Sequence, residues 1–193
     1  MAQIIKYYLD QKPLSNSDIS NLKKSKNKFT DELFPPDDNS LFSANKDGIY
    51  LDQNLGKKIA EKFVKSLKYI PNWKRISEMP ELNQIYDEKN FSFECIIQGA
   101  IGDCYLISAL CELSQYPKLL MNNDNIENSI NIINKYEPDV GYYEFKLFID
   151  GEYQIVIVDD YIPFDEYFDD ISFAKTSKNF YWVSLLEKVL QKL

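Results

Sequence analysis

The chain has 193 residues, of which 45% are apolar and 15% aromatic, so it is long enough to bury one substantial core. Its 30 acidic and 22 basic residues give a net charge of −8, and the lysines are scattered, which argues against nucleic acid and anionic membranes as partners. There are three cysteines, the N-terminus lacks the apolar core of a secretory signal, and no apolar run approaches the roughly 20 residues that cross a bilayer. We therefore expect a soluble protein of the reducing cytoplasm.

The first 45 residues are polar and rich in lysine and asparagine, with turn signals at 13–16 and 35–39. Within them, residues 17–26 have the composition of a short polar helix. Such an arm could dock on the rest of the chain or on a partner, but we expect a solvated, partly mobile N-terminal arm over residues 1–45 and one domain over 46–193.

Residues 54–69 carry apolar side chains at helical spacing, with lysines between them. This pattern predicts an amphipathic helix whose lysines face the solvent.

The segment 98–110, QGAIGDCYLISAL, sets a cysteine behind two glycines and ahead of an apolar run. It predicts a helix over about 103–115, apolar nearly all round and therefore buried, with Cys104 at its N-terminus. Backbone N–H groups and the helix dipole favour negative charge there, so a thiol ionises more easily than in water. Gln98 could turn its amide to the same spot and form, with the Cys104 N–H, a two-donor oxyanion hole. The alternative is that Asp103 only caps the helix and Cys104 is a small buried apolar residue.

The other two cysteines are expected to be structural. Cys111 lies two turns further along the predicted helix, on the same face as Cys104, and is interpreted as core packing. Cys95 is interpreted in the same way. A redox pair between Cys95 and Cys104 is an alternative that depends on a close approach of their Cα atoms.

Residues 142–149 and 152–159 alternate apolar and polar side chains around Asp150-Gly151, which predicts two antiparallel strands joined by a tight turn. The acidic residues at 159–160 and 165–170 lack the ligand spacing and glycine of a calcium loop, so we expect solvated turns there. The chain ends in a predicted helix over 182–193 with an apolar stripe made of Leu185, Leu186, Val189, Leu190 and Leu193.

Segment 98–110 closely resembles the active-site segment of the calpain family of cysteine proteases. Further segments similar to that family follow in the family's order: FPP at 34–36, WKRISEM at 73–79, VIVDDYIP at 156–163 and YWVSLLEK at 181–188. The resemblance spans roughly residues 29–193. It implies an α+β fold, the first subdomain of a papain-like calpain protease core, in which a central buried helix carries the cysteine and packs with further helices and a small antiparallel β-hairpin.

Carried over to this chain, the resemblance makes Cys104 the nucleophile and Gln98 the oxyanion-hole donor of an endopeptidase that acts on polypeptides. In calpains the general-base histidine and its orienting asparagine lie in a second subdomain, which begins just after the helix of segment 181–188, where this chain stops. The chain has no histidine, and no Lys, Asp or Glu has an evident claim to act as the base that a cysteine protease needs. We therefore expect the N-terminal half of a calpain-like intracellular cysteine endopeptidase, inactive alone, whose partner is a second protease subdomain in the same or another chain.

Conventional calpains bind calcium in this subdomain, at positions that correspond to Cys95 and Phe180. Neither a thiol nor a phenyl ring supplies the oxygen ligands that Ca²⁺ requires, and Glu94 would have to shift by one residue to compensate, so no cofactor or metal is predicted. Tyr105 replaces the tryptophan that follows the nucleophile in the family, which decides little.

Two alternative functions stay open. The first is a non-catalytic, calpain-related binding or structural module in a larger cytosolic or cytoskeletal assembly, which the missing histidine and calcium ligands favour. The second is an unrelated thiol enzyme, which would need a base that the sequence does not offer.

Overall fold

The computed structural model describes residues 11–37, 40, 72–82, 84–86, 96–100, 104–116 and 132–193. Within these ranges the chain combines α-helices with strands that pair antiparallel, in agreement with the expected α+β class. The predicted helix over 54–69 and the predicted boundary near residue 45 lie outside the described residues. No helix in the described part of the chain is long and apolar enough to cross a membrane.

The helices and strands follow one another along the chain as α2 (Asn16–Ser25), β1 (Asn72–Arg75), the 3-10 helix η1 (Ile76–Glu78), β2 (Ile96–Ile97), α5 (Cys104–Ser114), β3 (Ile133–Glu137), the 3-10 helix η3 (Pro138–Val140), β4 (Tyr142–Ile149), β5 (Glu152–Asp159), β6 (Tyr161–Asp165), β7 (Asp170–Ile171), β8 (Lys175–Thr176) and α7 (Trp182–Lys192).

The predicted hairpin is confirmed and belongs to a larger sheet. Strands β4 and β5 pair along their whole length, and the turn between them places Asp150 at φ 52° and Gly151 at φ 92°, the left-handed backbone that a tight hairpin turn requires. Strand β3, which the sequence pattern did not predict, pairs with the other edge of β4. Strands β1, β6 and β7 form a second sheet, and β2 and β8 form a two-stranded ribbon.

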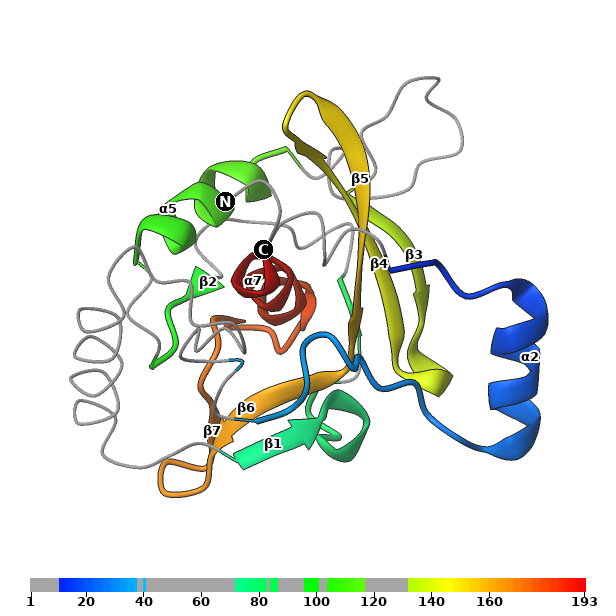
Figure 1. Ribbon diagram of the computed structural model, residues 1–193. Coiled ribbons are helices and arrows are strands. Elements are labelled where there is room, and N and C mark those ends of the chain that lie inside the picture. The colour runs from blue at the N-terminus through cyan, green and yellow to red at the C-terminus, as the bar shows by residue number, and fades with distance from the viewer. Residues whose placement is uncertain are drawn as a thin grey trace, which may run out of the picture.

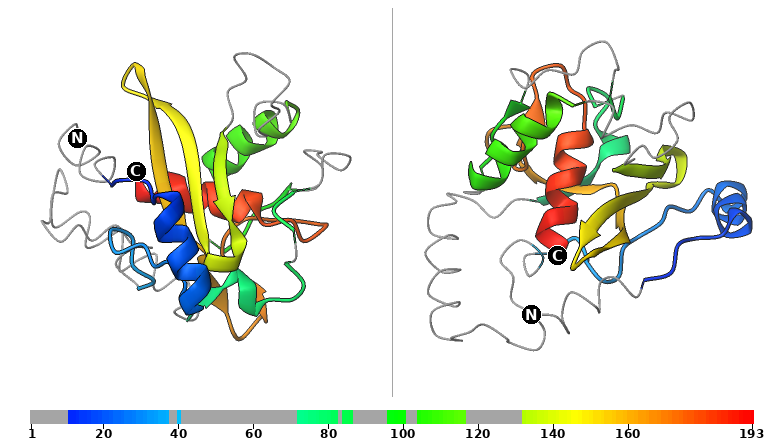
Figure 2. Two further views of the ribbon diagram at one scale, coloured as in Figure 1. Left: turned by 90° about the vertical axis from the view of Figure 1, so that its right-hand side faces the viewer. Right: turned by 90° about the horizontal axis from the view of Figure 1, so that it is seen from above.

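Helix α7 runs through the middle of the fold, with α5 on one side of it and the β3–β4–β5 sheet on the other (Figure 1). The view from above shows the same order (Figure 2). Its predicted apolar stripe is confirmed at Leu185, Leu186 and Val189, each at most 2% exposed. The central buried helix of this fold is therefore α7.

Helix α5, the cysteine helix, is confirmed in place but buried on one face only. Leu106, Ile107 and Leu110 join the main core, whereas the side chain of Tyr105 is 76% exposed and that of Ser108 is also exposed. The prediction that this helix is central and buried nearly all round is wrong. An apolar composition favours burial but does not determine how many neighbours pack on a helix, and α5 packs on the core along one side.

Both faces of the β4–β5 hairpin are covered, because alternate residues of a strand point in opposite directions. Tyr143, Phe145 and Val158 point into the main core with α7. Tyr142 and Ile157 point the other way and pack in a second apolar cluster, which helix α2 covers from outside (Figure 2).

Helix α2 confirms the predicted short polar helix, but it is docked rather than solvated. A capping box at its start joins Ser15 and Asp18, and Ile19, only 4% exposed, anchors the helix in the second cluster. Just before the helix, the Leu14 backbone N–H donates to the Tyr142 hydroxyl at 3.0 Å. The described part of the arm thus follows the alternative in which it docks on the rest of the chain: Leu14, Ile19, Leu22 and Phe29 pack on the outer face of the hairpin, while most other side chains of α2 face the solvent.

Candidate active site

Cys104 is the first residue of helix α5, and its side chain is exposed. The first backbone N–H groups of an α-helix have no partner within the helix, so this end of α5 is electrostatically suited to a thiolate. The alternative in which Cys104 is a small buried apolar residue is contradicted by its exposure. Cys111, on the same helix, is half-buried and packs against the main core, as predicted.

Gln98 follows strand β2 on a segment that is held at both ends. Before it, β2 pairs antiparallel with β8. After it, the Ala100 N–H donates to the Ser172 carbonyl at 2.8 Å. A Cβ on Gly99 would lie 2.2 Å from that same carbonyl oxygen, so only glycine fits there. The backbone on each side of Gln98 is therefore fixed to one stretch of chain, residues 172–176.

The side chain of Gln98 is exposed, like that of Cys104. Residues 101–103, which connect the two positions and include the predicted cap Asp103, lie outside the described residues. The approach of the Gln98 amide to the Cys104 thiol stays a prediction, as does the redox pair with Cys95, which also lies outside the described ranges.

Helix α7 holds the stretch 172–176 from the interior. The Ala174 N–H donates to Glu187 Oε2 at 2.5 Å, and Ser184 Oγ donates to the Ala174 carbonyl at 2.7 Å. All three residues are fully buried. Helix α7 therefore holds the middle of this stretch, while its start is held by the Ser172 N–H, which donates to the Pro163 carbonyl at 2.8 Å.

Phe180, at one of the two positions that bind calcium in the resembling family, is part of the packing around α7. Its ring packs against the main core, and its backbone N–H donates to the Thr176 hydroxyl oxygen at 2.8 Å. Among the described residues, no group of three or more His, Cys, Asp or Glu side chains could hold a metal ion. Cys95 and Glu94 lie outside those ranges, so independence from calcium stays a prediction.

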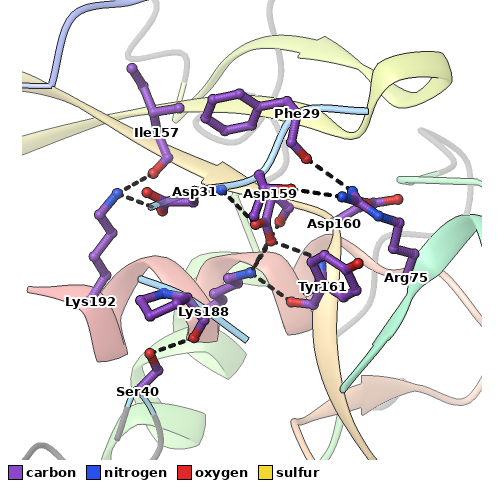
Figure 3. A network of polar contacts seen from close by, with 12 residues as sticks. Phe29, Asp31, Ser40, Arg75, Ile157, Asp159, Asp160, Tyr161, Lys188 and Lys192 are labelled. Atoms are coloured by element: carbon purple, nitrogen blue, oxygen red, sulfur yellow. Dashed lines mark hydrogen bonds and ion pairs between the residues drawn. The ribbon is translucent and has the colours of Figure 1, made fainter. Parts of the chain in front are cut away.

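A network of buried ion pairs connects the segments that carry the resemblance (Figure 3). The pairs are Asp159–Lys188, Asp160–Arg75 and, at 2.6 Å, Asp31–Lys192. The prediction that residues 159–160 form a solvated turn is wrong, since Asp159 is 0% and Asp160 1% exposed. Their positive partners come from distant parts of the chain and neutralise them inside the fold.

Asp159 has three donors, namely Lys188 Nζ and the backbone N–H groups of Asp31, at 2.7 Å, and Tyr161, at 2.9 Å. Lys188 also donates to the Tyr161 carbonyl at 2.7 Å. One turn further along α7, burial lowers the pKa of Lys192, against the opposing effect of Asp31. The network joins the segment around residue 31, the β5–β6 connection and α7 into one unit.

The polar side chains of α7 were not among the functional residues predicted from the sequence. Ser184, Lys188 and Lys192 recur every four residues, which places them on one face of a helix. Because this helix was predicted to pack against the core, polar residues repeated on one of its faces indicate that they bind buried polar groups elsewhere in the chain.

Comparison with known families decides the family. The model of the calpain family of cysteine proteases matches residues 29–193. This range includes the three buried ion pairs as well as Gln98 and Cys104. This chain belongs to the calpain family. The match begins after helix α2, so the docked arm over residues 11–28 lies outside the calpain match.

Three relatives illustrate the similarity. The calpain-type cysteine protease ADL1 of Oryza sativa subsp. japonica is 27% identical over 177 residues, and the calpain-type cysteine protease DEK1 of Zea mays is 28% identical over 185 residues. Each match covers 89% of this chain and 7% of the relative. Calpain-14 of Homo sapiens is 31% identical over 121 residues, which cover 63% of this chain and 17% of that protein. The chain thus spans less than a fifth of the length of these calpains.

Proposed function

We propose that this chain is the N-terminal half of a calpain-like intracellular cysteine endopeptidase core, with Cys104 as the nucleophile and Gln98 as an oxyanion-hole donor. The observation that carries the proposal is the exposed thiol at the first turn of α5 in a chain of the calpain family. The exposed side chain of Gln98, on a backbone segment fixed on both sides, supports it.

In this reaction the Cys104 thiolate attacks the carbonyl carbon of a peptide bond, and the π electrons of the C=O bond move onto the carbonyl oxygen; when the C=O bond re-forms, the C–N bond breaks and its electrons leave with the amine. The Gln98 amide and the Cys104 N–H donate to that oxygen, which is the interaction that an oxyanion hole provides. The departing amine needs a proton, and the chain has no histidine to supply one. The proposed partner is therefore a second subdomain that carries a histidine and an asparagine, and this chain alone does not turn over peptides.

The substrates on this proposal are polypeptides, and the site of action is the cytoplasm. Calcium is not required, since Phe180 packs its ring against the core where conventional calpains place an acidic ligand. Nucleic acid and membranes are not partners.

The alternative is a non-catalytic calpain-related module that binds other proteins in a larger cytosolic or cytoskeletal assembly. One observation favours it, namely the absence of histidine from all 193 residues. On that alternative Cys104 is retained without reacting.

The test is the rate at which iodoacetamide labels Cys104, followed by mass spectrometry of the 193-residue chain alone and of the chain with a histidine- and asparagine-bearing calpain subdomain added or fused after Leu193. We expect fast labelling at neutral pH, and cleavage of an unfolded polypeptide, only when the second half is present. Cys111, which is half-buried, is the internal control for general thiol reactivity. Cys104→Ser should abolish labelling and cleavage without changing the circular dichroism spectrum. Equal, slow labelling of Cys104 in both forms, without cleavage, would support the binding module instead.

A further inference from the structure

Two buried side chains of α7 hold Ala174, which lies in the same short stretch of chain as Ser172 and Phe173, the residues that contact the backbone beside Gln98. We propose that Glu187 and Ser184 are positioning residues for Gln98, because they hold Ala174 and thereby the stretch 172–176 on which the Gln98 segment rests. The proposal rests on the proposed role of Gln98 as an oxyanion donor.

The first step is the hold of α7 on Ala174. Glu187 accepts the Ala174 N–H at 2.5 Å and Ser184 donates to its carbonyl at 2.7 Å, so both backbone polar groups of this fully buried residue depend on α7 side chains. A buried N–H that loses its acceptor is costly, so removal of the Glu187 carboxylate favours a shift of the backbone at Ala174.

The second step runs from this stretch to Gln98. Ser172 accepts the Ala100 N–H at 2.8 Å, and an added Cβ on Gly99 would lie 2.2 Å from the Ser172 oxygen and 2.4 Å from the Phe173 oxygen. The two backbones are therefore in direct contact with no space between them. The β2–β8 ribbon has two residues in each strand, which is too short to keep its register without this support.

The consequence for catalysis follows from the geometry that an oxyanion hole requires. A displacement of about 1 Å in a catalytic group can lower a rate by about a hundredfold. Alkylation of a thiol by iodoacetamide forms no oxyanion, so it does not depend on Gln98. Loss of the Glu187 contact should therefore slow peptide cleavage while leaving alkylation of Cys104 unchanged.

The first test is hydrogen exchange of the amides in residues 96–100, measured on the 193-residue chain. Glu187→Ala should accelerate their exchange by at least about tenfold through local opening, whereas Glu187→Gln, which keeps an acceptor oxygen for the Ala174 N–H, should not. Lys192→Met is the matched control, because it also removes a buried polar group of α7 but one without contact to Ala174. Ser184→Ala is the milder second variant if Glu187→Ala does not fold. Unchanged exchange in Glu187→Ala, or equal acceleration in Lys192→Met, would overturn the proposal.

The second test uses the core assembled with its second half. Glu187→Ala should lower kcat by about ten- to a hundredfold, with KM and the iodoacetamide labelling of Cys104 unchanged. In a Gln98→Ala background the same substitution should have no further effect, because Glu187 acts through Gln98. A full additional loss in that background would overturn the proposal. If the unmodified assembly cleaves no polypeptide, the proposed function fails, and the exchange measurement still decides whether α7 holds the Gln98 segment.

Discussion

Replacing Lys188 with methionine removes the cation from a fully buried ion pair. Asp159 keeps its two backbone donors, from Asp31 and Tyr161, but loses its counterion, and the Tyr161 carbonyl loses its donor at 2.7 Å. Removing one partner of a buried pair usually destabilises a protein by about 3–5 kcal/mol, because the remaining charge stays buried without compensation. We expect Lys188→Met to lower the free energy of unfolding by that amount, out of the roughly 5–15 kcal/mol that holds a domain together.

The assay is urea unfolding followed by circular dichroism, with a charge-free double variant and an exposed pair as controls. Asp159→Asn combined with Lys188→Met removes the uncompensated charge as well, so it should recover at least about 1 kcal/mol relative to Lys188→Met alone. Lys23→Met breaks the ion pair between Lys23 and Glu137, which is 2.7 Å long but lies at the surface. Surface pairs contribute little, so this substitution should change the free energy of unfolding little. A loss in Lys188→Met no larger than that in Lys23→Met, or no recovery in the double variant, would refute the reasoning.

Two further predictions concern the Gln98 segment and the buried tyrosines. Gly99→Ala puts a methyl group 2.2 Å from the Ser172 carbonyl oxygen, so the amides of residues 96–100 should exchange faster, whereas Gly151→Ala, where nothing lies within 4 Å of the new Cβ, should leave that segment unchanged. Equal exchange in both variants would contradict this. Burial, aided by Tyr181, raises the pKa of Tyr143, so above a pH of about 10 the unfolded chain ionises at this residue before the folded chain does, and stability falls as the pH rises. Tyr143→Phe should therefore flatten that decline by up to about 1.4 kcal/mol per pH unit in urea unfolding between pH values of about 9 and 11, and an unchanged slope would be evidence against it.

Several elements could be predicted because their signals are local. The β4–β5 hairpin depends on a residue alternation and on one turn that accepts a left-handed backbone, and both can be seen within eighteen neighbouring residues. The start of α5 at Cys104 was indicated by glycines followed by an apolar run of helical spacing. The short strands β2, β7 and β8 were not predicted, because two residues carry too little pattern and their pairing partners are far away in the chain.

The relative burial of the two long helices was predicted in the wrong order. The cysteine helix α5 is the more uniformly apolar sequence, yet Tyr105 and Ser108 are exposed. Helix α7 contains Glu187 and Lys188, yet both are fully buried. Composition measures the tendency of a segment to leave water, whereas burial also depends on which partners the rest of the chain supplies.

The sequence by itself determined the family, the position of Cys104 at a helix start, the hairpin and the two terminal helices, because neighbouring residues encode each of them. Only the tertiary structure decided that residues 159–160 are neutralised inside the fold, that the N-terminal arm is docked, and that α7 supports the Gln98 segment. The physical reason is the same in each case. A buried charge or an unpaired backbone group is tolerated only with its partner, and these partners lie between 10 and 161 residues away in the chain.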